Sequence, residues 1–516
     1  SDDGFVIYLT KTPSGTLTGE WSKLCFPNPA SLWRAAVCAR LRGNMSARHS
    51  RILVFALIGA PLWIGGCVHY QDRPISPAAI AGAFERRSLV DDGLRDFLRR
   101  NAIIADTSPW PVQSWDYETL SWAAFYYHPS LELARAQWTT LTAGQVTAGS
   151  RSNPTLTLTP GYNVSSGSSS PWFPAVGFDL PVETAGKRQH RINQAQRAAE
   201  SARQIVFSAA WQVRSELRRT VATWTHAEAR AVALNVLAEA DQRIVELVES
   251  RRAAGAASSL DAASARLAWR RSEADAADSL QQATIALSNV AQALGLPASA
   301  VSNLTVTDVL PRLSLPSDAE FAAARSLALR QRPDLLAALA DYEVTQHALR
   351  LEIARQYPNL HLGPGYQWDQ GASKWSLAIT AELPLFNRND GPIAEAEARR
   401  KESAAHFAAL QAQVMSGIDR AKFALAAAEA RTKSIQRIVA SLTHQQAIQQ
   451  ARLDAGDIDQ RDFQITRREL SAARLTEIDA RAVADQAAAE LEAALQVPFG
   501  RLSNLIEASV TSVSFP

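Results

Sequence analysis

The sequence predicts a mainly α-helical chain that also carries four β-strands and is internally duplicated. Three observations support this fold class: an internal repeat, paired segments in which apolar and polar residues alternate, and long proline-free runs with apolar residues every three or four positions. Hydrophobic residues make up 47% of the 516 residues, which excludes a disordered chain. Lys+Arg 53 against Asp+Glu 51 leaves a formal charge of +2, so we expect no nucleic-acid partner.

Residues 45–66 show the order of features expected of a secretion signal. Met45 is followed by two basic residues, Arg48 and Arg51, and then by an uncharged apolar stretch of 13 residues at 52–64. That length is typical of the apolar part of a signal peptide and is too short to span a bilayer. We therefore expect residues 45–66 to be removed from the mature protein.

The apolar stretch ends in Ile64-Gly65-Gly66-Cys67, and small residues directly before a cysteine resemble the cleavage site of bacterial lipoproteins. The sequence thus predicts Cys67 as the lipidated N-terminus. Val68, in place of an aspartate, resembles the signal for sorting to the outer membrane. Residues 1–44 are then expected to be a non-native upstream extension. The alternative is a buried apolar helix that ends in a cysteine by chance.

The remainder of the chain repeats itself. Segment 154–162, PTLTLTPGY, aligns with segment 358–366, PNLHLGPGY, at an offset of 204 residues. Further along, the offset settles at 201 and pairs Arg251 with Arg452, Gly255 with Gly456, Asp261 with Asp462, and Pro297 with Pro498. The expected organisation is an N-terminal periplasmic segment at 67–114, a first repeat at 115–310, a second repeat at 311–500 and a C-terminal tail at 501–516.

Each repeat contains two segments with the period of two that is typical of a strand with one apolar face. We expect strands at about 154–164 and 172–182 in the first repeat, and at about 358–368 and 374–385 in the second. Each is about ten residues long, which is the length that crosses a bilayer at the tilt of a barrel strand. Two soluble hairpins, each buried on one face, would show the same local pattern.

Two long helices follow the strands, at about 189–254 and 393–455. Neither run contains proline, and only Gly417 interrupts the second. Their apolar residues recur at alternating steps of three and four, which predicts coiled-coil packing. At 1.5 Å per residue each helix reaches on the order of 95 Å. Each then meets a glycine, Gly255 or Gly456, at which we expect the chain to reverse into a second helix.

Four strands of membrane-crossing length cannot close a barrel, because about eight is the smallest closed number and open edges are not tolerated in lipid. We therefore expect an oligomer. Two chains would supply eight strands and fill the barrel with their own side chains, whereas three would supply twelve and leave a lumen.

These residues resemble the TolC family of outer-membrane efflux ducts over about 115–500. The resemblance rests on the duplicated Pro-x-Leu-x-Leu strand entry, the Leu-Pro-(Val/Leu) strand exit, and the turn signature Arg-x3-Gly-x5-Asp in both repeats. The residues around Gly186-Lys187-Arg188 and Leu385-Phe386-Asn387 look most like the heavy-metal and solvent efflux branch.

The resemblance implies a lipid-anchored homotrimer with a twelve-stranded barrel in the outer membrane and an α-helical barrel across the periplasm. It also implies two partners, a periplasmic adaptor of the membrane fusion class and an inner-membrane pump of the resistance-nodulation-division (RND) class. Export through the duct would be passive. The exit duct of a type I protein secretion system and a coiled-coil adaptor lipoprotein remain alternatives.

By the same resemblance, the functional residues lie at the helical tips. Asp462 matches the family's aperture aspartate, and Asp459 lies in the same turn. The residues expected to contact the adaptor are Arg251, Gly255, Arg452 and Gly456. Helix capping is the alternative for Asp462 and the preferred interpretation for Asp261, because an aspartate beside a glycine turn often caps the next helix.

Nothing in the sequence favours an enzyme or a cofactor site. The histidines are scattered without metal-ligand spacing, and no phosphate-binding loop opens a helix. We therefore expect no catalytic, cofactor or metal residues.

Overall fold

The computed structural model describes residues 68–101, 103–105, 109–164, 171–306 and 316–497. The chain divides into two units, 1–76 and 77–516. The described part of the first unit, 68–76, contains no helix or strand and is exposed. Cys67 and the expected signal peptide lie outside the described residues. All that follows concerns the second unit.

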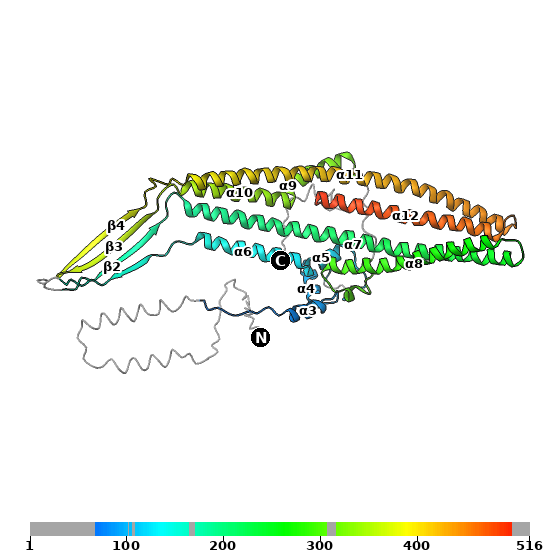
Figure 1. Cartoon of the computed structure of the whole chain (residues 1–516), viewed down its shortest axis with the longest axis horizontal. Coiled ribbons are helices and arrows are strands. Elements are labelled where there is room, and N and C mark those ends of the chain that lie inside the picture. Colours follow the sequence, from blue (N-terminus) through cyan, green and yellow to red (C-terminus); the bar gives the residue numbers. More distant parts are fainter. Residues whose placement is uncertain (1–67, 102, 106–108, 165–170, 307–315, 498–516) are drawn as a thin grey trace, which may run out of the picture. The chain divides into compact units, whose positions relative to one another are not determined.

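The two repeats have the same order of elements, so the predicted duplication is confirmed (Figure 1). The first repeat consists of α5 (Tyr117–Tyr127), α6 (Pro129–Gly149), β1 (Thr155–Thr159), β2 (Ala175–Val182), α7 (Lys187–Ala253) and α8 (Ser259–Leu294). The second consists of α9 (Asp318–Gln331), α10 (Pro333–Ala354), β3 (Leu360–Asp369), β4 (Ala372–Ala381), α11 (Asp390–Asp454) and α12 (Gln460–Leu495). The shorter elements are α3 (Pro77–Glu85), α4 (Asp92–Arg100) and η2 (Ala298–Val301).

The long helices α7 and α11 have 67 and 65 residues, which corresponds to roughly 100 Å each. Each begins two or three residues earlier than expected, after a residue in the left-handed conformation, Gly186 (φ 70°) or Asn389 (φ 64°). The predicted rows of apolar residues along these helices, which we call the seams, are partly buried. Their buried members are Ala199, Ala202, Val206 and Val213 in α7, and Val414, Ile418, Ala421, Leu425 and Ala428 in α11.

Each repeat builds its own hydrophobic core where its short helices pack against its long hairpin. In the first repeat the core joins α4, α5, α7 and α8, and its fully buried members include Leu94, Leu98, Leu120, Leu217 and Leu294. In the second repeat the core joins α9, α11 and α12 around Ile418, Leu425, Leu491 and Leu495.

The repeats are joined by ion pairs between α7 and α12, which we call the inter-repeat ladder. Its rungs are Arg218–Glu492 (2.5 Å), His226–Asp485 (2.9 Å), Arg230–Asp479, Asp241–Arg468 (2.5 Å) and Arg251–Asp459 (2.7 Å). The side chains of Arg218 and Glu492 are 6% and 4% exposed, whereas those of Arg251 and Asp459 are 44% and 49% exposed. The ladder therefore runs from a buried rung to a solvated one.

The four strands form one antiparallel sheet in the order β1-β2-β3-β4, at the end of the long helices opposite to the hairpin turns (Figure 1). Three strands are shorter than predicted at one end, in each case beside a proline, which cannot donate a backbone hydrogen bond. Beyond Pro160 and Pro174 the pairing continues only as an isolated bridge between Tyr162 and Trp172. β1 ends at Thr159, before Pro160, and β2 begins at Ala175, after Pro174. β4 ends at Ala381 rather than 385, because the Leu385 N–H donates to the Leu383 carbonyl (2.8 Å) in a tight turn around Pro384.

The register places all large apolar side chains on one side of the sheet. The apolar face consists of Leu156, Leu158, Val176, Phe178, Leu180, Val182, Leu360, Leu362, Pro364, Tyr366, Trp368, Trp375, Leu377 and Ile379. The polar face consists of Thr155, Thr157, Thr159, Ala175, Gly177, Asp179, Pro181, His361, Gly363, Gly365, Gln367, Asp369, Lys374, Ser376, Ala378 and Thr380. The side chains of the polar face are mostly small, whereas Trp375, Leu377 and Ile379 on the apolar face are 66–81% exposed.

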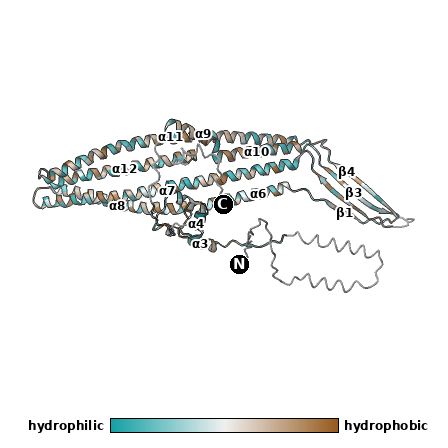
Figure 2. Ribbon diagram, turned by 180° about the vertical axis from the view of Figure 1, so that it is seen from behind, coloured by the Kyte–Doolittle hydropathy of each residue, from teal (hydrophilic) through white to brown (hydrophobic). Residues whose placement is uncertain are grey.

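Polar and apolar residues are mixed along the long helices (Figure 2). Of the helices in the described part of the chain, none is both long enough and apolar enough to cross a membrane.

Candidate functional site

The two hairpin tips are sharp reversals at which the first long helix of each repeat ends. Gly255 (φ 75°) and Gly456 (φ 81°) occupy the left-handed region directly after the helix. The Ala256 N–H donates to the Arg251 carbonyl, and the Asp457 N–H donates to the Arg452 carbonyl, both at 2.8 Å. This six-to-one bond is typical of a Schellman C-cap. An added Cβ would meet nothing within 4 Å at either glycine, so backbone conformation rather than space favours glycine there.

At the first tip, Asp261 has a capping role. Ser258 is the N-cap of α8, and its hydroxyl oxygen accepts a hydrogen bond from the Asp261 N–H (3.0 Å). The Asp261 carboxylate in turn accepts from the Ser258 hydroxyl (2.8 Å) and the Ser258 N–H (3.1 Å). These two donors hold the pKa of the Asp261 carboxyl below its usual range. The preferred sequence interpretation of Asp261 agrees with this geometry.

At the second tip, the N-cap is Asp459 rather than Asp462. An Asp459 carboxylate oxygen accepts from the Asp462 N–H (2.9 Å), and its other oxygen pairs with Nη1 of Arg251 in the first tip (2.7 Å). The Asp462 N–H and the Arg251 guanidinium lower the pKa of the Asp459 carboxyl. Asp459 therefore caps its own helix and links the two tips.

Asp462 lies in the first turn of α12 and is exposed. Within the described part of the chain, its carboxylate has no hydrogen-bond or ion-pair partner, which distinguishes it from Asp261 in the equivalent position. The Arg452 guanidinium likewise has no partner among the described residues, although its counterpart Arg251 pairs with Asp459. Asp462 and Arg452 of the second tip are thus both exposed and unpaired among the described residues.

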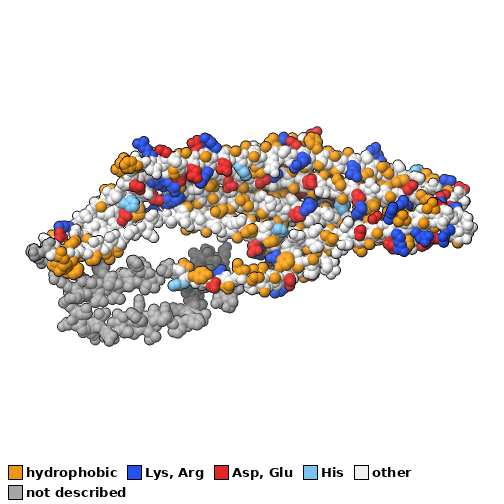
Figure 3. All heavy atoms as spheres, in the orientation of Figure 1, with side chains coloured by type: hydrophobic (Ala, Val, Ile, Leu, Met, Phe, Trp, Pro, Cys, Tyr) orange, Lys and Arg blue, Asp and Glu red, His pale blue; other side chains and the backbone are white. Residues whose placement is uncertain are grey.

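Charged side chains of both signs gather over the tips of the two hairpins (Figure 3). Arg461 of the second tip lies near enough to Asp261 of the first to contribute to the lowering of that carboxyl's pKa. The sequence reasoning missed Arg461 and the whole inter-repeat ladder, because partners 208–274 residues apart leave no local signal. The only available sign was the opposite charge of Arg251 and Asp459 at neighbouring turns.

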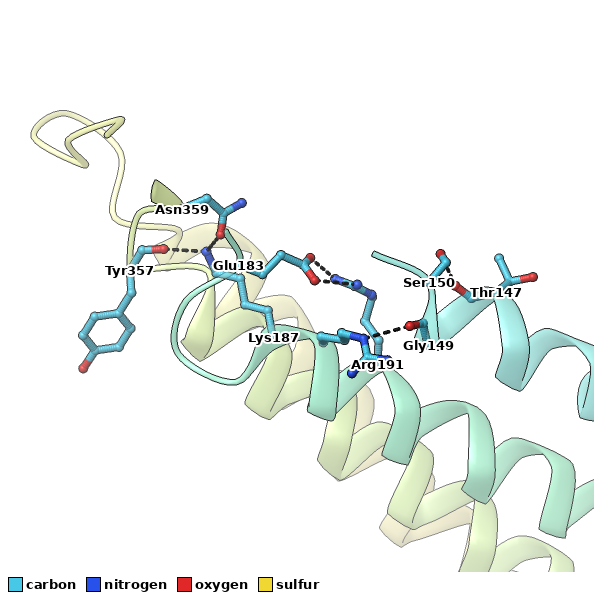
Figure 4. Close-up of polar contacts among 9 residues, drawn as sticks. Thr147, Gly149, Ser150, Glu183, Lys187, Arg191, Tyr357 and Asn359 are labelled. Atoms are coloured by element: carbon cyan, nitrogen blue, oxygen red, sulfur yellow. Dashed lines mark hydrogen bonds and ion pairs between the residues drawn. The ribbon is translucent and has the colours of Figure 1, made fainter. Parts of the chain in front are cut away.

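Basic residues at the start of α7 make hydrogen bonds and an ion pair at the junction between the sheet and the helices (Figure 4). Nζ of the buried Lys187 donates to the Tyr357 carbonyl and to Oδ1 of Asn359, both at 2.6 Å. Arg191 makes a bidentate ion pair with Glu183. Burial lowers the pKa of Lys187. These contacts tie β2 and its following helix to the chain that enters β3, and so fix where the sheet leaves the helices.

A comparison with protein-family models matches the model "Outer membrane efflux protein" twice, at residues 124–296 and 324–496. The chain belongs to this family. The resemblance to the TolC family is thereby confirmed, and the protein is an outer-membrane protein. The family is one of channels rather than enzymes.

One similar relative is the cobalt-zinc-cadmium resistance protein CzcC of Cupriavidus metallidurans, with 28% identity over 222 residues. That match covers 42% of this chain and 51% of the relative, so the chain matches about half the relative's length. Among solved structures, CusC superposes with a TM-score of 0.58 at 17% identity, covering 76% of this chain and 95% of CusC. VceC of Vibrio cholerae superposes with a TM-score of 0.60 at 20% identity, covering 74% and 96%. These likenesses show the fold.

Proposed function

We propose that the chain is one protomer of a homotrimeric outer-membrane duct in a tripartite efflux pump. The duct passes small molecules or metal ions outward passively, while the energy enters at an inner-membrane RND pump that is joined to it by a periplasmic adaptor. The observation that carries the proposal is the four-stranded sheet, which has all its large apolar side chains on one face and a free edge on each side.

β1 and β4 are the edge strands of the sheet, and within the described residues each is hydrogen-bonded to a neighbouring strand on one side only. An unpaired strand edge is not tolerated in hydrocarbon, so the sheet needs further copies of itself. Three copies supply twelve strands, enough to close a barrel around a lumen. In that barrel the apolar face meets lipid, and the polar face, with its small side chains, lines the lumen.

The cargo assignment rests on the partial likeness to CzcC, which is named for resistance to cobalt, zinc and cadmium. On this basis we place the chain in the heavy-metal branch of the family. Lipidation at Cys67, removal of 45–66, and the repeat bounds 115–310 and 311–500 belong to the same proposal.

The gate belongs at the hairpin tips. Asp462 supplies an unpaired carboxylate there, and three copies near a three-fold axis form an acidic ring that attracts cations and repels anions. Asp459 closes the tip by its contact with Arg251. The adaptor then contacts the tips through Arg251, Gly255, Arg452 and Gly456.

The proposal is tested by deleting the gene in its host and measuring tolerance to cobalt, zinc and cadmium. Deletion should lower the tolerated concentration of at least one of these metals severalfold, and the full-length gene should restore it. A gene that lacks the Cys67 codon is the matched control in the same assay, because it tests whether the lipid anchor is needed. Unchanged metal tolerance with loss of a secreted protein from the medium would favour the type I secretion alternative instead.

A further inference from the structure

His361 and Asp179 form an isolated pair on the polar face of the sheet. They lie on the neighbouring strands β3 and β2, and Nδ1 of His361 is 3.0 Å from both carboxylate oxygens of Asp179. Both side chains remain accessible, at 41% and 46% exposed. Asp369 and Lys374 form a second ion pair on this face, at 2.7 Å. The face is otherwise uncharged, so His361 is its one imidazole among the described strand residues.

The pair lines an open cavity of about 900 Å³ at the junction of the sheet with the helices. Glu183, Thr380 and Glu382 line the same cavity, and Lys187 and Asn359 form part of its wall (Figure 4). In the described part of the chain, no group of three or more His, Cys, Asp or Glu residues is arranged to hold a metal ion. Within one chain, a metal ion here would therefore meet fewer than three such ligands, and water would fill its remaining positions.

The geometry of the pair selects one histidine tautomer. A neutral imidazole that donates its Nδ1–H to a carboxylate carries its lone pair on Nε2, and this arrangement accompanies metal-ligating histidines generally. The Nε2 atom of His361 has no hydrogen-bond partner among the described residues. Imidazole nitrogen favours cobalt, nickel, zinc and related ions over magnesium, which prefers oxygen.

We infer that Nε2 of His361, oriented by Asp179, is a single-ligand contact for divalent transition-metal ions moving through the lumen. The inference rests on the proposed function, which turns the polar face toward the lumen and supplies three copies. A single imidazole holds such an ion weakly and releases it quickly. A conduit needs this property, because a tightly bound ion would block the conduit.

The first test measures ion currents through the purified full-length protein in planar bilayers, with zinc or magnesium added at equal ionic strength. In a background that opens the tips and removes their acidic ring, Asp459→Asn with Asp462→Asn, zinc should reduce the current at millimolar concentration, and His361→Gln should abolish this effect while leaving the magnesium response unchanged. Asp179→Asn should raise the zinc concentration for half block on the order of tenfold, because it removes the group that orients the imidazole. Asp369→Asn is the matched control: it breaks the other ion pair of the same face and should change the zinc and magnesium responses equally.

The second test does not require a pore. Copper(II) with ascorbate oxidises the histidine that binds the copper, and peptide mass spectrometry of the detergent-solubilised protein locates the product. We expect oxidation at His361 that falls severalfold in Asp179→Asn. Zinc block that persists in His361→Gln in the same open-tip background, or a His361 that is not oxidised above exposed His406, would overturn the inference. A protein that is oxidised at His361 but conducts no ions would support the site and refute the proposed duct.

Discussion

At the second hairpin tip, Asp459 has two partners, and a pair of substitutions separates them. Asp459→Asn keeps a good N-cap but loses the charge that pairs with Arg251. Asp459→Ala loses both. We expect the asparagine variant to increase the basal conductance of the closed duct with little change in thermal stability. The alanine variant should in addition destabilise the start of α12 by about 1 kcal/mol. Equal basal conductance in the wild type and the asparagine variant would show that the Arg251 contact does not close the tip.

The pKa of Asp459 also sets the pH range of this contact. Because the folded pKa lies below the ordinary value of 3.8, the stabilising contribution is complete above 3.8 and is lost as the pH falls through the folded pKa. The Arg251–Asp459 link should therefore be insensitive to pH between 5 and 8. When closed-state conductance is measured across that range, the wild type should show no pH-dependent change that is absent from Asp459→Asn.

Asp462 and Asp261 occupy equivalent positions but should respond differently to neutralisation. Asp462→Asn should weaken the block of the closed duct by divalent cations severalfold, because its carboxylate is unpaired and faces solvent. Asp261→Asn should leave that block unchanged and only weaken a capping box. Single-channel recordings with graded calcium distinguish the two. If Asp462→Asn lowered stability without affecting the block, the gate would lie elsewhere on the tip.

The repeat offset predicted which residues share a position in the two tips, but it could not show how differently they are used. The difference originates three residues earlier, where Ser258 is matched by Asp459. A serine hydroxyl donates to the Asp261 carboxylate and holds it. Two carboxylates repel each other, so Asp462 is left free. This is a contact between side chains, and residue spacing alone does not reveal it.

At the scale of the elements, the buried rung of the inter-repeat ladder should carry most of the ladder's stability. Glu492 accepts from Arg218, lies 3.6 Å from Arg214, and both guanidinium groups lie over the ring of Tyr117. Glu492→Gln leaves two cations without their anion and should cost about 3 kcal/mol. Asp479→Asn, at a half-exposed rung, should cost less than about 1 kcal/mol. Denaturant unfolding followed by circular dichroism in detergent measures both.

Equal destabilisation by Glu492→Gln and Asp479→Asn would contradict this difference between the buried and the half-exposed rung.

Tyr117 provides an independent check of the buried rung. Burial, opposed in part by Arg214, raises the pKa of its hydroxyl to about 12. In the folded protein the absorbance of this hydroxyl should therefore titrate at a higher pH than that of free tyrosine.

The elements themselves were predicted well wherever a long periodic pattern specifies them. The heptad seams placed α7 and α11 within about three residues. The alternating pattern placed the four strands but extended three of their ends too far, because the regular ladder is interrupted at Pro160, Pro174 and Pro384 while the apolar residues continue past them. Beyond Pro160 and Pro174 only an isolated bridge between Tyr162 and Trp172 remains. Side-chain periodicity reports which face a residue occupies, whereas strand ends depend on available backbone N–H groups.

At the scale of the whole molecule, the proposed trimer requires β4 of one copy to pair with β1 of the next. Within one chain these strands are separated by β2 and β3, which is about 14 Å and beyond the reach of a disulfide. Cysteine pairs that join Thr157 with Ser376 or Thr380, which lie on the same face of the sheet, should therefore cross-link only between copies. At least one pair should give covalent trimers on a denaturing gel, with each single-cysteine variant as its control. Exclusively monomeric, internally cross-linked protein would rule out this assembly.

The small side chains on the polar face of the sheet also determine where flow through such a duct is limited. In the proposed trimer, Gly177, Gly363, Gly365 and Ala378 would leave a wide bore at the sheet, whereas the hairpin tips would bring charged side chains together. The two regions act as resistances in series, and the larger one sets the current. A bulkier residue at Gly363 would therefore leave the conductance of the closed duct unchanged and would become measurable only after the tips are opened. In the proposed duct, solutes would leave the cell at the sheet, but their rate of passage would be set roughly 100 Å away, at the far end of the helices.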